Sequence, residues 1–350
     1  MKISILTFSK ETNFGANLQC YALCKTLQGM GHSVDIIDIQ LRSYSMSWYS
    51  AILRLPMIYL FNKFRKQHLN LFTCHFKNVE DLRKNCPKSD MYIVGSDQVW
   101  NPKITKRLDP LVYFFSFLPE TAHRISYAAS FGTSTWDNPE LSSEVKQLLR
   151  KFDAISVREG AGVEICKQVF NVEAKIVADP TLLLSSYDNI CGKYDSACET
   201  NDLTYYTFVH NKSIQSILAD FALSHNLNAV VLRNNHSYPG FKRKMYVSVS
   251  EWLNSIRYSK IVVTTSFHCM VFCLLFHRRF VVVPGKSERS NRQTHLLNLL
   301  GLSEYYCPTP QDLPEKLEKA MTAYTDYQKV DSLIESMRKQ SLDYLFNAIK

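Results

Sequence analysis

The sequence predicts an α/β protein made of two doubly wound domains that face each other across a cleft. Three observations support this fold class. Short apolar runs alternate with helix-like runs, which is typical of parallel sheets covered by helices. The alternation occurs twice, and a polar stretch at about 180–200 separates the two series. The length of 350 residues suits two hydrophobic cores better than one.

The first series begins with an apolar strand at Ile3–Phe8, a helix at Asn17–Met30 and a strand at Ser33–Ile39. The next expected strands are short apolar runs that end in polar residues or glycine: Met91–Val94, Arg124–Ala129, Ala154–Val157 and Ala174–Val177. Polar strand ends are informative because parallel sheets bind ligands beyond the carboxyl ends of their strands.

The second series repeats this order. Its expected strands are Leu203–Val209, Ala229–Arg233, Ile261–Thr264 and Phe280–Val283, and its expected helices are Lys212–His225, Ser250–Arg257 and Phe267–Phe276. We therefore expect domains at 1–190 and 191–325, with an insertion at about 43–75 in the first. An amphipathic helix at 326–350 is able to cross back onto the first domain.

The insertion contains a segment, Met46–Gln67, in which aromatic and aliphatic residues mix with arginine and lysine, and Pro56 interrupts it. Two interpretations stay open. The segment is a helix packed on the sheet, or it is an interfacial element that touches an anionic membrane surface.

Composition limits the class of protein. The net charge of +9 favours anionic partners, although a soluble basic enzyme has the same balance. We find no signature of a nucleic-acid-binding module. The ten cysteines contain no CxxC pair, so we expect reduced, mostly buried thiols and no zinc site. The chain begins with a strand-like run, and no apolar run reaches about 20 residues, so we expect a cytoplasmic protein.

The stretch IVVTTSFHCMVFCLLF, residues 261–276, places a histidine where a strand meets a helix. Ser266 has the chemistry of an N-cap, which puts His268 in the first helical turn. Helix N-termini attract anions, so the turn predicts an anion site with an acid/base group attached. The alternative is a histidine that only bonds to the backbone.

Polar side chains also follow the strands of the first series. Side chains suited to sugar hydroxyls or to a sugar face are Asn17, Gln19, Gln98, Trp100 and Ser130. Asp97 is a candidate base or hydroxyl acceptor. Arg158 is a candidate bidentate ligand for a carboxylate or phosphate.

An ordered set of motifs resembles the polysaccharide pyruvyl transferase family from about Lys2 to Leu302. The motifs are FGANLQCYAL, VGSDQVWNP, SYAASFGTS, ISVREGAG, VADPTLLL, VVTTSFHCMVF and RQTHLLNLLGL. The resemblance implies a GT-B-like fold of two Rossmann-like domains. It also implies transfer of the pyruvyl group of phosphoenolpyruvate to two sugar hydroxyls, which gives a cyclic ketal and phosphate. No metal-binding constellation is visible, so we expect metal-independent chemistry with no cofactor.

The resemblance also implies roles for residues. His268 corresponds to the histidine of the family's Ser-x-His motif, and Ser266 stands where some members carry an arginine. Arg292 is then a replacement for that charge. The implied donor-binding set is Arg158, Ser266, Lys286, Arg289 and Arg292, and the catalytic pair is His268 and Asp97. Whether His268 is the acid or the base stays open.

The biological setting implied is bacterial surface polysaccharide, either capsular or exopolysaccharide. The acceptor would be a galactose-type sugar, for example on a lipid-linked oligosaccharide at the inner face of the membrane. Two other functions remain to be weighed. They are a nucleotide-sugar glycosyltransferase on the same architecture, and a binding or scaffold protein without activity.

Overall fold

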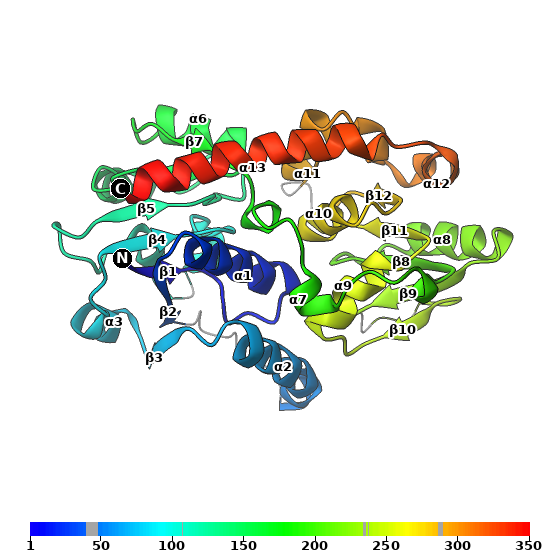
Figure 1. Cartoon of the computed structure of the whole chain (residues 1–350), viewed down its shortest axis with the longest axis horizontal. Coiled ribbons are helices and arrows are strands. Elements are labelled where there is room, and N and C mark those ends of the chain that lie inside the picture. The colour runs from blue at the N-terminus through cyan, green and yellow to red at the C-terminus, as the bar shows by residue number, and fades with distance from the viewer. Residues whose placement is uncertain (40–47, 107, 234–235, 237, 286–289) are drawn as a thin grey trace. The chain divides into compact units, whose positions relative to one another are not determined.

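The computed structural model describes residues 1–39, 48–106, 108–233, 236, 238–285 and 290–350 (Figure 1). Within them the chain forms two compact units. Unit 1 contains Met1–Leu55, Arg65–Ser185 and Ser336–Lys350, and unit 2 contains Pro56–Phe64 and Ser186–Glu335. Each unit has its own parallel sheet.

The sheet of unit 1 has five parallel strands in the order β3-β2-β1-β4-β5. Their bounds are β1 Lys2–Leu6, β2 Ser33–Ile39, β3 Phe72–Phe76, β4 Met91–Val94 and β5 Arg124–Ser126. Strand β1 is central, because Ile3 pairs with Val34 of β2 and with Met91 of β4. A central parallel strand is covered on both faces, which explains why these runs are apolar throughout.

The helices of unit 1 are α1 Phe14–Gly29, α3 Val79–Asn85, α4 Pro102–Thr105, α5 Ser142–Leu149 and α6 Gly160–Gln168. Helix α1 begins three residues earlier than predicted, because the Asn13 side chain accepts from the Ala16 N–H at 3.1 Å and caps it. The stretch FGANLQ is therefore the start of α1 and not a loop before it. Gly31, at φ +88°, follows the end of this helix.

The structure contains only the first half of the predicted strand Arg124–Ala129. Strand β5 ends at Ser126, and Ala128 has a φ of +50°, which interrupts the extended backbone. Ala129 then makes single parallel bridges to Asp97 and Val157. A two-stranded sheet of β6 Ser156–Val157 and β7 Lys175–Ile176 follows in the chain.

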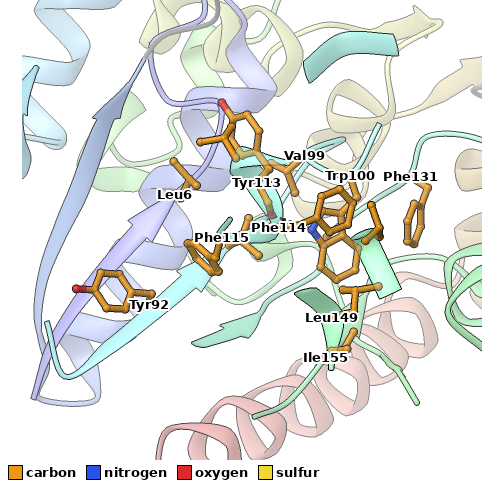
Figure 2. Packing of buried hydrophobic residues seen from close by; sticks show 14 of the residues in the cluster. Leu6, Tyr92, Val99, Trp100, Tyr113, Phe114, Phe115, Phe131, Leu149 and Ile155 are labelled. Atoms are coloured by element: carbon orange, nitrogen blue, oxygen red, sulfur yellow. Dashed lines mark hydrogen bonds between the residues drawn. The ribbon is translucent and has the colours of Figure 1, made fainter. Parts of the chain in front are cut away.

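A large hydrophobic cluster rich in aromatic residues fills the core of unit 1 and includes residues of its five-stranded sheet (Figure 2). The Trp100 and Phe114 rings stack with centroids 5.4 Å apart and planes 8° apart. The Trp100 indole N–H donates to the Tyr113 carbonyl at 3.0 Å, so its polar atom is satisfied inside the core. This packing fixes the segment that follows β4.

The sheet of unit 2 repeats the topology in the order β10-β9-β8-β11-β12. Its strands are β8 Asp202–Tyr206, β9 Asn228–Leu232, β10 Lys242–Lys244, β11 Ile261–Thr264 and β12 Phe280–Val282. Its helices are α7 Asp188–Cys191, α8 Lys212–Ser224, α9 Val249–Arg257, α10 Phe267–Leu275, α11 Ser290–Leu299 and α12 Leu313–Thr322. In both sheets the chain adds strands to one side of the first strand and then to the other.

Two long helices contribute residues to both units: α2 Trp48–His68 and α13 Tyr327–Ile349. The first part of α13 belongs to unit 2, where Asp331 pairs with His277 at 3.0 Å. The second part belongs to unit 1. There the Tyr344 hydroxyl donates to the Ser126 carbonyl at 2.9 Å, and the Ala178 N–H donates to Ser341 Oγ at 2.8 Å.

The cysteines lie as the sequence predicted: all ten are free thiols, and seven of them are buried. No helix in the described part of the chain is both long and apolar enough to cross a bilayer.

Candidate active site

The reversal of strand order creates a switch point in each sheet, between β1 and β4 in unit 1 and between β8 and β11 in unit 2. Loops leave such a point in opposite directions, which opens a place for a ligand at the carboxyl ends of the strands. Asp97 follows β4, and His268 follows β11. The two predicted catalytic residues therefore lie at the two switch points.

The turn between β11 and α10 has the capping geometry that the sequence predicted. Ser266 is the N-cap of α10, and its side chain accepts from the Cys269 N–H at 3.4 Å. The Ser266 N–H donates to Thr264 Oγ1 at 3.0 Å. His268 is buried in the first turn. The positive end of the helix dipole therefore lies beside a titratable ring.

Threonines tie this turn to the loop after β8. Thr264 Oγ1 donates to the Tyr206 carbonyl at 2.8 Å, and the Phe208 N–H donates to Thr265 Oγ1 at 3.1 Å. Thr265 also donates to Thr207 at 3.3 Å. These bonds join the two loops of the switch point, so the start of α10 is held by tertiary contacts as well as by its cap.

Arg292 of α11 lies close to this helix start. Its guanidinium carbon is 5.7 Å from the Phe267 ring centroid, and the Phe267 and His268 ring centroids are 5.5 Å apart. An arginine and a histidine thus contact the same phenyl ring. Lys286 and Arg289, the other predicted donor ligands of this loop, lie outside the described residues.

Sequence reasoning missed three basic side chains at the same edge of the unit 2 sheet. Arg233 follows β9 with a φ of +51°. His210 follows β8, and its ring centroid is 4.5 Å from that of His236. Gln215 Nε2 is 2.8 Å from His210 Nδ1. Their position just beyond the strand ends is the sequence feature that could have revealed them. The predicted strand Ala229–Arg233 included Arg233, so this residue was not recognised as lying beyond the strand end.

In unit 1, Asp97 sits on an unusual backbone. Its φ is +75°, and its carboxylate accepts from the Gln98 N–H at 2.9 Å. Its side chain is 18 % exposed. Gly95 precedes it at φ +118°, and a Cβ there would lie 2.1 Å from the Tyr127 carbonyl oxygen. Only glycine fits this turn, and the turn presents Asp97 at the strand end.

Arg158 is surrounded by carboxylates. Its nitrogens lie 2.8 Å from Asp179, 3.1 Å from Asp97 and 3.6 Å from Glu159, and its side chain is 1 % exposed. Burial alone would lower the pKa of Arg158, but the three carboxylates outweigh it and raise that pKa above its ordinary value. One cation among three anions repels a further anion. This environment argues against the predicted donor-binding role of Arg158.

The predicted acceptor ligands of unit 1 lie inside the protein. Asn17, Gln19, Trp100 and Ser130 have no exposed surface, and Gln98 is buried. Gln19 accepts from the Ser96 N–H at 3.1 Å and donates to Thr7 at 2.9 Å, which joins the loops after β1 and β4. Ser130 donates to Glu159 at 2.5 Å. A side chain without exposed surface cannot touch a sugar in this conformation, so the four residues with none support the switch point from inside. Gln98 keeps a small exposed surface and stays a predicted acceptor ligand.

Comparison with known proteins decides the family. A family model described as polysaccharide pyruvyl transferase matches residues 13–287. The chain belongs to the polysaccharide pyruvyl transferase family. Among curated proteins, none matches the sequence.

Solved structures similar to this pyruvyl transferase family member share its fold. One is a UDP-GlcNAc 2-epimerase from Methanocaldococcus jannaschii, at TM-score 0.55 and 12% identity, with 97% of this chain and 100% of that chain covered. Another is an alpha-glucosyltransferase in complex with UDP and DNA, at TM-score 0.55 and 11% identity, with 100% of this chain and 99% of that chain covered. Spinosyn forosaminyltransferase SpnP matches at TM-score 0.50 and 10% identity, with 98% of this chain and 95% of that chain covered. The chain therefore has a GT-B-like α/β fold with two Rossmann-like units, as predicted.

Proposed function

We propose that this family member transfers the pyruvyl group of phosphoenolpyruvate to two hydroxyls of a galactose-type sugar in bacterial surface-polysaccharide biosynthesis. The products would be a cyclic pyruvate ketal and inorganic phosphate. The observation that carries the proposal is the start of α10, where Ser266, His268 and Arg292 gather beside the helix N-terminus in a chain of this family.

The donor chemistry fits unit 2. Phosphoenolpyruvate has a carboxylate and a phosphate, and helix N-termini and arginine are the groups that bind such anions. We assign it to the carboxyl edge of β8, β9 and β11, with Arg292 as a cation beside the helix start. Arg233 adds a second positive charge at this edge. Arg158 is left out of the donor site because carboxylates already surround it.

The reaction needs an acid and a base. Protonation of the methylene carbon generates an oxocarbenium-like centre at C2, one sugar hydroxyl adds there, and the bond to phosphate breaks. The second hydroxyl then closes the ring. Of the two hydroxyl protons lost, one balances the proton taken up by the methylene carbon and the other ends on phosphate. We assign a proton-transfer step to His268, and a hydroxyl-accepting role to Asp97 in unit 1.

No group of three or more His, Cys, Asp or Glu side chains within the described residues is placed to hold a metal ion. Chemistry without a metal or cofactor stays a prediction. Incubation with a chelator followed by the turnover assay would test it. Activity that is lost on chelation and restored by one metal would contradict it.

The decisive experiment measures phosphate release from phosphoenolpyruvate with and without a panel of galactosides, with mass spectrometry of the products. We expect release that depends on the acceptor, and a product heavier by one pyruvate ketal. A thermal-shift comparison of phosphoenolpyruvate with UDP-sugars accompanies it. Stabilisation by a UDP-sugar alone, with transfer of its sugar, would replace the proposal by a glycosyltransferase function.

A further inference from the structure

Helix α2 carries an exposed apolar stripe that the proposed function does not use. Ile52, Leu55 and Tyr59 are 52 %, 57 % and 66 % exposed. At 3.6 residues per turn these three positions share one face of the helix. Large apolar side chains that gather on one exposed face mark an interaction surface.

The opposite face of α2 packs on the protein. Met57, Phe61 and Phe64 are buried and follow the same helical spacing. The Arg233 guanidinium carbon lies 5.7 Å from the Phe61 ring centroid, and Arg65 donates to Asn17 at 3.1 Å. The helix is thus attached by one side, and the apolar stripe is its outer side.

Charge indicates the partner. No aspartate or glutamate occurs anywhere between Asp38 and Glu80, whereas six lysines and arginines do. This segment therefore carries six of the nine net positive charges of the chain. Two of them, Lys63 and Lys66, are exposed and continue the outer face of α2 one and two turns beyond Tyr59.

We propose that the outer face of α2 docks on an anionic lipid surface. The apolar stripe would enter the headgroup–acyl boundary while the lysines contact lipid phosphates. A second copy of the chain is a poorer partner. A two-fold contact sets the same patch against itself, and this patch offers no acidic side chain to pair with the lysines.

The test is co-sedimentation of the full chain with vesicles of phosphatidylcholine alone or of phosphatidylcholine mixed with phosphatidylglycerol. We expect binding to the mixed vesicles only, and weaker binding as salt is added. Combining Lys63→Gln with Lys66→Gln should lower the affinity about fivefold for each lysine. Equal binding to both kinds of vesicle, or to neither, would overturn the proposal.

A second variant combines Ile52→Ser, Leu55→Ser and Tyr59→Ser, and we expect it to lose at least tenfold in vesicle affinity. Matched controls replace exposed residues elsewhere: Leu223→Ser with Tyr324→Ser for the apolar stripe, and Lys212→Gln with Lys319→Gln for the charges. The controls should bind like the parent chain. Light scattering accompanies the series. A dimer that disappears in the apolar variant, without vesicle binding by the parent, would assign the face to a second copy instead.

Discussion

The positive charge of Arg158 offsets the negative charges of the carboxylates around it, so the loss of this one side chain should destabilise unit 1. Arg158 and Asp179 are each 1 % exposed in their side chains and lie 2.8 Å apart. Arg158→Leu leaves buried carboxylates without their cation, which typically costs about 3–5 kcal/mol of unfolding free energy. Urea unfolding would measure the loss. Arg150→Leu, at the exposed residue that follows α5, is the control and should change stability by less than about 0.5 kcal/mol. Equal losses in the two variants would contradict this account of Arg158.

His268 is the residue on which the proposed chemistry depends. Removal of a general acid or base commonly lowers turnover by about 10²–10⁴-fold. We expect that loss for His268→Gln, with the melting temperature unchanged within a few degrees. Steady-state phosphate release measures it. His225→Gln is the matched control, because that imidazole stacks on Phe221 in the same unit. Turnover of the His268 variant within twofold of the parent would remove His268 from the mechanism.

Local chemistry made some of these residues predictable. The Ser266 cap follows from hydroxyl-to-backbone bonding within three residues, so the sequence alone located it and the start of α10. The burial of Trp100 and Ser130 depends on partners far along the chain. Ser130 bonds to Glu159, 29 residues away, and Trp100 packs on Phe152. A residue beyond a strand end is therefore easy to find, but its exposure is not.

At the scale of elements, the turn after β4 depends on a glycine. A Cβ on Gly95 would collide with the Tyr127 backbone oxygen, which lies on the segment that follows β5. Gly95→Ala must also adopt a φ of +118°, so we expect a loss of more than about 1 kcal/mol in stability and a displaced Asp97. Gly29→Ala is the control. That site lies in α1 with nothing within 4 Å, and alanine there should stabilise by about 0.4–1 kcal/mol. Thermal unfolding of both variants measures the two changes in stability. A loss of stability in both variants would contradict the specific role of Gly95.

Two strands were not predicted from the sequence, and the reasons differ. β3 and β10 are the edge strands at one end of their sheets. β10 has the sequence Lys-Arg-Lys, and most of β3 is exposed or half-buried. Charged residues suit an edge strand because they hinder pairing with other chains, but in β10 they also remove the apolar pattern that reveals a strand. β3 has the sequence Phe-Thr-Cys-His-Phe and falls almost wholly within the predicted insertion at about 43–75. The central strands are buried on both faces, so their apolar runs remained visible.

At the scale of the molecule, the repeated strand order follows from the alternation in the sequence, which predicted two doubly wound sheets. The membership of each unit does not follow from alternation. Unit 1 includes Ser336–Lys350 because hydrogen bonds reach across 163 residues to Ala178 and 218 residues to Ser126. Pairings of that separation leave no local signal. The C-terminal residues are therefore structural partners of a unit that begins at Met1.

Because Ser336–Lys350 belongs to unit 1, a destabilising substitution in this part of α13 should affect unit 1 and not unit 2. Leu345 of α13 is fully buried and belongs to unit 1, whereas its neighbour Phe346 is 58 % exposed. Leu345→Ala removes buried methyl groups and leaves a cavity, which commonly costs about 2–5 kcal/mol. Hydrogen exchange should accelerate in β4 and β5 of unit 1 and stay unchanged in β8 and β11 of unit 2, because the lost contacts lie in unit 1. Phe346→Ala is the control and should leave both sheets as protected as in the parent. Equal acceleration in the two sheets, or the same pattern in the control, would mean that the second part of α13 does not stabilise unit 1 selectively.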